Sequence, residues 1–261
     1  MAALKNWRLV IEYDGSRYCG WQVQPQVNTV QAEVERALTT ALREKVSIQG
    51  SGRTDAGVHA DGQVANFKTD AEIHAHRLRW QINALLPRDI VVHEVEAVSE
   101  DFDARRSAIE RTYSYLILSR PVPSVFWRSY SLWVSKTFNI EAAGIGAKAL
   151  VGTHDFSAFT VARVGSMVRT VTAVDVIGDR PVGMAHNGGT RTEGLITIRI
   201  TANAFLHHMV RLIVGTLVEV AAEKMEPGRV KEILESKDIG QAGPRAPAKG
   251  LRLEKVSYPS N

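Results

Sequence analysis

Apolar residues along the chain follow two patterns, which together predict alternating strands and helices. Strands are predicted where apolar and β-branched residues cluster or alternate, over residues 7–13, 63–67, 90–98, 111–118, 170–177, 195–202 and 252–258. Helices are predicted where apolar residues recur at three- and four-residue steps, over residues 29–45, 76–86, 139–151, 205–224 and 227–236. A similar order of elements returns after about residue 108. The pattern therefore predicts an α+β protein with two lobes, residues 1–108 and 109–261, packed about one cleft.

The composition is that of an ordinary globular protein with a mild excess of positive charge. Of the 261 residues, 44% are hydrophobic, which is enough for a sizeable core. The net charge of +4 suits a partner that carries phosphates, without establishing one. The single cysteine, Cys19, excludes an internal disulfide framework and a cysteine-rich zinc site. The first residues lack the apolar core of a signal peptide and no segment has the length of a membrane span, so we expect a cytoplasmic protein.

The most unusual stretch is the glycine-rich block at residues 50–60. Its glycines allow the backbone to bend or to approach a ligand closely, and Arg53 and Asp55 stand two residues apart within it. The block does not match the phosphate-cradling pattern of nucleotide hydrolases. One interpretation is a hairpin in which Asp55 caps a turn. The other is a presented carboxylate, ionised near neutral pH, that acts as a covalent nucleophile without a separate base.

Two further segments carry groups suited to a nucleic acid. Residues 14–22 form a loop that is either a structured turn with Trp21 buried or a surface that offers Arg17 to a phosphate. On the strand at residues 111–118, a period of two places Arg111, Tyr113 and Tyr115 on one face. That face is either a half-buried aromatic layer or a platform on which Tyr113 stacks a base.

The histidine spacing does not favour a metal site. His74 and His76 are two apart, and His207 and His208 are adjacent, whereas residues that face one another on a helix are three or four apart. No cysteine pair and no His-x-x-x-His with a glutamate accompanies them. We therefore predict no metal, and interpret His207 or His208 as a helix residue with one exposed side.

Six blocks of the sequence, in order, resemble the tRNA pseudouridine synthase A family. The Arg-Thr-Asp-Ala-Gly-Val-His run is the most specific of them. The matching blocks are Glu12–Gln22, Gly52–Ala60 with Gln63, Arg111–Tyr113, Gly152–Phe156, Ala204–Arg211 with Val214 and Gly215, and Ala246–Ala248 with Gly250 and Leu251. They extend over essentially the whole chain.

The resemblance implies an isomerase that needs no cofactor and converts uridine to pseudouridine at positions 38–40 of the tRNA anticodon stem-loop. It places Asp55 on the catalytic aspartate and Tyr113 on the tyrosine that contacts the target base. It places Arg53 where an arginine helps to hold the flipped nucleotide, and Arg211 in a helical motif that brings a basic residue near the aspartate. The implied fold is two RRM-like (ferredoxin-like) halves, with mainly antiparallel sheets, around a central basic cleft. The implied assembly is a homodimer.

The chain departs from the family pattern at two places. Arg106 stands where the family usually has phenylalanine, which affects local packing or an RNA contact. Residues 178–191 form a longer segment than the usual turn, and their composition predicts a surface loop.

Two other functions remain as alternatives. A non-catalytic RNA-binding protein on an RRM-like scaffold would bind tRNA without needing Asp55, but the aromatic signature of an RRM strand is absent from the sequence. A histidine-metal hydrolase is disfavoured by the histidine spacing.

Overall fold

The computed structural model describes residues 4–162, 164–178 and 194–259, and the chain divides into two compact units. The first is Met1–Arg111 with Arg252–Asn261, and the second is Thr112–Leu251. The chain enters the second unit within strand β5 and returns to the first at the start of strand β10. Both units combine strands with helices, and five α-helices lie in the described residues. The predicted α+β class is confirmed.

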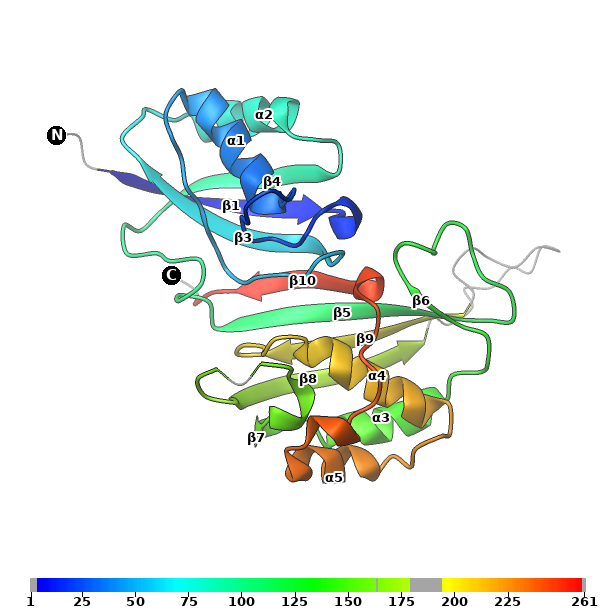
Figure 1. The fold of residues 1–261 in the computed structure, drawn as a ribbon. Helices are drawn as coiled ribbons and strands as arrows, with labels where there is room; N and C mark the ends of the chain where they lie inside the picture. Colours follow the sequence, from blue (N-terminus) through cyan, green and yellow to red (C-terminus); the bar gives the residue numbers. More distant parts are fainter. Residues whose placement is uncertain (1–3, 163, 179–193, 260–261) are drawn as a thin grey trace. The chain divides into compact units, whose positions relative to one another are not determined.

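The first unit is a mainly antiparallel sheet with two helices on one face (Figure 1). Its elements are β1 (Lys5–Tyr13), α1 (Val30–Leu42), β2 (Gln49–Gly50), β3 (His59–Thr69), α2 (Ala75–Leu85), β4 (Ile90–Val98) and β10 (Leu251–Ser257). The strand order is β4-β1-β3-β10, with β2 also paired to β3. Strand β1 runs antiparallel to both β3 and β4, whereas β10 runs parallel to β3.

The core of this unit follows from the two periodicities in the sequence. In β1, Trp7, Leu9 and Ile11 point to one side because the side chains of a strand alternate, and all three are buried. In α1, Val30 and Val34 lie one helical turn apart and are fully buried. These two apolar faces supply the burial that stabilises the unit.

The second unit combines five strands with three helices in the described residues. Its elements are β5 (Glu110–Ser119), β6 (Leu132–Val134), α3 (Ile140–Lys148), β7 (Gly152–Asp155), β8 (Val168–Gly178), β9 (Leu195–Ala202), α4 (Met209–Ala221) and α5 (Arg229–Ser236). The strand order is β5-β9-β8-β7, with β6 parallel to β5. Strand β8 is antiparallel to both β7 and β9. Helix α3 packs against α4 and β8, and α5 packs against α3.

One predicted helix start lies four residues too early, and one predicted loop lies almost entirely outside the described residues. The helix expected from residue 205 begins only at Met209, because His208 has a left-handed φ of 64° that a continuing helix does not allow. Of the segment at residues 178–191, only Gly178 lies within the described residues.

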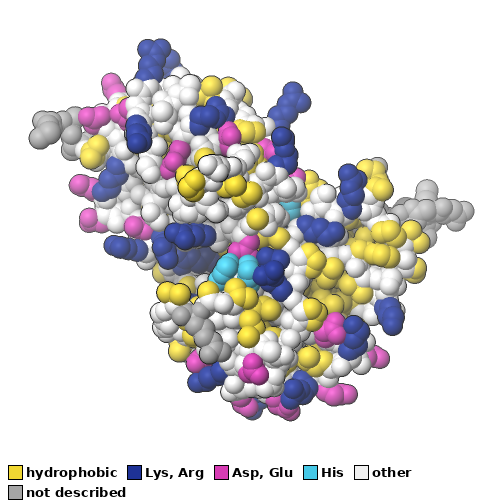
Figure 2. Space-filling model, in the orientation of Figure 1, with side chains coloured by type: hydrophobic (Ala, Val, Ile, Leu, Met, Phe, Trp, Pro, Cys, Tyr) yellow, Lys and Arg dark blue, Asp and Glu magenta, His cyan; other side chains and the backbone are white. Residues whose placement is uncertain are grey.

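Charged side chains of both signs are interspersed on the face drawn in Figure 2, in keeping with the small net charge. None of the helices in the described ranges is long and apolar enough to cross a membrane.

Candidate functional site

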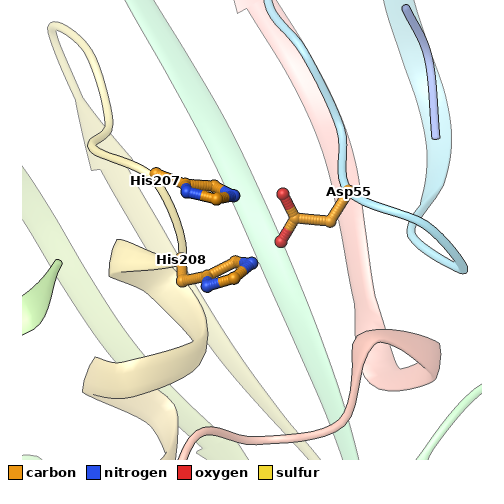
Figure 3. Close-up of side chains that lie close together, drawn as sticks. All are labelled: Asp55, His207 and His208. Carbon is orange, nitrogen blue, oxygen red and sulfur yellow. The ribbon is translucent and has the colours of Figure 1, made fainter. Parts of the chain in front are cut away.

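Asp55 lies in the first unit, on the loop that connects β2 to β3 (Figure 3). The block is a hairpin, as one interpretation expected, since β2 and β3 pair antiparallel; a capping role of the Asp55 side chain stays a prediction. The Asp55 carbonyl oxygen accepts a hydrogen bond of 3.1 Å from the Val58 amide, which closes a turn directly after the aspartate. Gly57, inside that turn, has a φ of 77°, a conformation that favours glycine. The side chain of Asp55 is half-buried.

The residue before Asp55 is held from two sides. The hydroxyls of Thr54 and Tyr13 share a buried hydrogen bond of 2.8 Å. The Thr54 carbonyl oxygen accepts a hydrogen bond of 3.1 Å from the Trp21 amide. Thr54, Tyr13 and Trp21 are all buried. The aspartate therefore follows a residue whose side chain and backbone are both anchored.

Two glycines let segment 13–21 approach the Asp55 loop with its backbone. A Cβ at Gly20 would lie 2.5 Å from the Thr54 carbonyl oxygen, and one at Gly15 would lie 1.9 Å from the Val58 carbonyl oxygen. Both distances are too short for a real side chain. A further bond of 3.3 Å joins the Gly57 amide to the Tyr18 carbonyl oxygen. The two sequence blocks at residues 12–22 and 52–60 are therefore parts of one structure.

The base of the loop is fixed by Ser51, Gln63 and Arg111. The Ser51 hydroxyl donates to the Gln63 side-chain oxygen at 2.7 Å, and the Gln63 amide donates to the Gly52 carbonyl oxygen at 3.0 Å. The Arg111 guanidinium donates to the carbonyl oxygens of Ser51 and Arg105, at 3.1 and 2.7 Å. These supporting residues were not predicted as such, although the sequence blocks already contain Gln63 and Arg111.

The two arginines predicted to bind substrate in this unit are exposed. Arg53 stands two residues before Asp55 on the same loop. The side chain of Arg17 is 81% exposed and lies 3.6 Å from the Asp89 carboxylate. Tyr18 donates its hydroxyl to the same carboxylate at 2.6 Å, and burial followed by this contact raises the pKa of Tyr18. Residues 14–22 are thus a structured turn with Trp21 buried, and they also offer Arg17 to solvent.

Tyr113 and Arg211, the candidate residues of the second unit, are each packed against neighbours within it. The Tyr113 ring meets the Phe205 ring edge to face, with centroids 5.0 Å apart at 83°. Arg211, in α4, donates from Nε to the Ala246 carbonyl oxygen at 2.8 Å, and the Ala246 amide donates back to Arg211 at 3.0 Å. Tyr115 donates its hydroxyl to the Pro247 carbonyl oxygen at 2.8 Å, and burial raises the pKa of Tyr115. The matching block at residues 246–248 therefore anchors both Arg211 and Tyr115.

The rings of His207 and His208 lie close together, with centroids 3.8 Å apart and planes tilted by 34° (Figure 3). The expectation that one of them is a helix residue is wrong, because both precede the first residue of α4. Helical spacing therefore does not govern where their rings point. His208 Nδ1 lies 2.8 Å from a guanidinium nitrogen of Arg245.

Comparison with known proteins gives one consistent result. The family model described as "tRNA pseudouridine synthase" matches residues 9–105 and 147–259. "tRNA pseudouridine synthase A 2" of Clostridium perfringens is 42% identical over 258 residues, covering 98% of this chain and 100% of that protein. Two proteins called "tRNA pseudouridine synthase A", from Clostridium acetobutylicum and from Thermoanaerobacter sp., are each 41% identical over 257 residues. Each match covers 98% of this chain and 100% of the relative.

Proposed function

Since the chain belongs to the tRNA pseudouridine synthase family and is an isomerase, we propose that Asp55 is its catalytic residue. The observation that supports this assignment is the Asp55 loop itself. Two glycine contacts and a buried hydroxyl pair fix the backbone on either side of one carboxylate. Fixed geometry of this kind is what a nucleophile needs, because misplacement by about 1 Å can cost about 100-fold in rate.

The chemistry suits a carboxylate as the nucleophile. The reaction breaks the bond between uracil N1 and ribose C1′, turns the base, and joins C5 to the same carbon. The C5 proton is released as the C5–C1′ bond forms and N1 takes up a proton, so the composition is unchanged, nothing is oxidised, and no cofactor is required in principle. A carboxylate can attack without a base to activate it. In this proposal the Asp55 carboxylate attacks either the uracil ring or the ribose.

The target uridine has to leave its stack before it can react. Flipping costs a few kcal/mol, and stacking on an aromatic ring returns about 1–3 kcal/mol. In the proposal, Tyr113 contacts the target base, supported by the rigid packing of its ring on Phe205. Arg53, Arg17 and Arg211 contribute guanidinium groups for phosphates and for the flipped nucleotide, supported for the first two by their exposure.

The proposal includes the finer points of fold, substrate and assembly. The fold consists of two RRM-like halves around a basic cleft, and the target is positions 38–40 of the tRNA anticodon stem-loop. The protein acts as a homodimer in the cytoplasm. The first unit supports the RRM-like part. Its strand–helix–strand–strand–helix–strand order and its sheet order β4-β1-β3-β2 match the split βαβ arrangement of ferredoxin-like folds.

Replacing Asp55 tests the proposal. Asp55→Asn removes the charge and little volume, so it should abolish pseudouridine formation in a single-turnover assay on unmodified tRNA transcripts. Binding of tRNA should persist, because phosphate contacts dominate affinity. Product mapped by position tells whether nucleotides 38–40 are the targets. Normal pseudouridine formation by Asp55→Asn would refute the assignment. If the protein only binds RNA, neither the wild type nor Asp55→Asn would form product.

A further inference from the structure

Tyr13 and Thr54 are the residues that we infer to be positioning residues for Asp55, acting through their shared hydroxyl–hydroxyl hydrogen bond. The inference rests on the proposed role of Asp55 and adds how the protein aims that carboxylate. Neither residue is proposed to touch the substrate. Both residues belong to the first unit, so their hydrogen bond lies within one compact body.

The path of strand β1 brings Tyr13 to the loop. Ile11 pairs with Gln63 on β3, but Tyr13 pairs with Ala60, so β3 has one residue more than β1 between the two pairs. This bulge bends the ladder where β3 leaves the Asp55 loop, and bulges of this kind re-aim side chains. Tyr13 is 2% exposed, and its ring lies 6.0 Å from the ring of Trp21. The Tyr13 hydroxyl therefore bonds to the Thr54 hydroxyl at 2.8 Å from an almost fully buried ring.

Thr54 transmits the constraint from Tyr13 to the backbone of Asp55. The Thr54 hydroxyl is bonded to Tyr13, and the Thr54 carbonyl oxygen accepts a hydrogen bond from the Trp21 amide. The peptide group between Thr54 and Asp55 cannot rotate without breaking the second bond, and the first bond holds the Thr54 side chain in place. Gly20 closes the remaining side, because even a Cβ at this position would lie only 2.5 Å from the Thr54 carbonyl oxygen. The Asp55 backbone is fixed on the other side by the bond from Val58. Of these contacts, the hydrogen bond between Tyr13 and Thr54 is the one that a substitution can remove by deleting a single oxygen atom, as in Tyr13→Phe.

The prediction is a slower chemical step with unchanged substrate binding. Tyr13→Phe and Thr54→Val should each lower the single-turnover rate constant by about 10- to 100-fold, since loosened geometry acts on the reacting step. The tRNA dissociation constant should stay within about twofold of wild type, since binding rests on phosphate contacts. Thr54→Ser keeps a hydroxyl and should restore most of the rate. The double variant should be no slower than the slower single variant, because both changes break the same bond.

A matched control is Thr69→Val at the other end of β3. Thr69 is buried, and its hydroxyl bonds to Glu44 and to the Ala71 amide, remote from the Asp55 loop in sequence and along the strand. It should lose stability while keeping the wild-type rate constant. A purely structural role of Tyr13 would lower the melting temperature and the active fraction, seen as reaction amplitude, but not the rate constant.

The outcomes separate this inference from the proposed function. If Asp55→Asn is inactive while Tyr13→Phe and Thr54→Val react at the wild-type rate, the positioning role is wrong and the role of Asp55 stands. If Asp55→Asn forms product normally, the role of Asp55 fails first. Additive effects in the double variant, or failure of Thr54→Ser to recover, would also overturn the positioning role.

Discussion

Gly50 and Trp21 pack so closely that a Cβ on Gly50 would lie 2.4 Å from the indole nitrogen. Trp21 is in turn the residue whose amide holds Thr54. Gly50→Ala should therefore displace the indole and destabilise the protein by about 1–3 kcal/mol, the usual cost of overpacking. Denaturant unfolding measures the loss, and the single-turnover rate should fall with it.

Gly144→Ala provides the comparison for that variant. Gly144 lies inside helix α3, and a Cβ there meets nothing within 4 Å. Alanine favours a helix over glycine by up to about 1 kcal/mol, so this change should be neutral or stabilising. Equal stability of the two variants would show that the Trp21 side chain can shift to make room for a methyl group at residue 50 without loss of stability.

Tyr113 is predicted to act through its ring. Tyr113→Phe keeps the edge-to-face contact with Phe205 and should retain most of the activity. Tyr113→Ala removes the ring and should lose about 1–3 kcal/mol of base capture, read as a lower single-turnover rate at equal tRNA occupancy. Circular dichroism checks that the variant is folded. Turnover by Tyr113→Ala at the wild-type rate would exclude the stacking role.

Arg17 should contribute to the salt dependence of tRNA binding. For duplex regions, log K against log[salt] falls by about 0.9 for each phosphate neutralised. Arg17→Ala should reduce that slope by about 1, the value for one lost phosphate contact.

Arg36→Ala removes the same charge from a guanidinium already bonded to Glu33 and to the Leu85 carbonyl oxygen. It should leave the slope unchanged. If both variants shift the slope equally, only the net charge matters and Arg17 has no specific contact.

Asp155 in the second unit should make stability depend on pH. The hydrogen bond from the Ser157 hydroxyl, with smaller help from Lys237 at 3.2 Å, lowers the pKa of Asp155. A lowered folded-state pKa contributes stability above the ordinary carboxyl value of about 3.9, and that contribution disappears as pH falls through the folded value. Asp155→Asn should therefore be less stable by about 1 kcal/mol near neutral pH. The difference should vanish at the acid end of a pH series of unfolding measurements, and a difference that stays constant with pH would contradict the assignment.

Long elements with a clear period could be predicted from the sequence, and short ones could not. Strands β4 and β9 have their predicted limits, because alternation over eight or nine residues is a strong signal. Strands β2, β6 and β7 have two to four residues, too few to show a period, and they exist because a longer strand pairs with them. The start of α4 was misplaced because nothing in the sequence marks the left-handed backbone of His208.

The candidate site could be predicted as pieces but not as a structure. The block around Asp55 stands out because of its glycines and charges, and so does the block at residues 14–22. That Gly20 lies against Thr54, and that Tyr13 bonds to it, depends on contacts between residues more than 30 positions apart. Sequence periodicity carries no information about such contacts. The glycines of residues 50–60 were interpreted as allowing the backbone to bend or to approach a ligand closely. Gly57 does adopt a left-handed φ, whereas Gly50 packs against the Trp21 indole.

The last strand makes the first unit discontinuous in sequence, and this determines when that unit can be completed during synthesis. Arg252 pairs with His59 and forms an ion pair with Asp61, and the Tyr258 hydroxyl bonds to the Ala104 carbonyl oxygen. A ribosome delivers these residues only after the whole second unit has been made, although N-terminal domains generally fold first. The nascent first unit therefore waits with one edge of β3 open, next to the loop that bears Asp55. That edge is completed only by β10, which is synthesised after the second unit, so the pairing of His59 and Ala60 next to the Asp55 loop forms late.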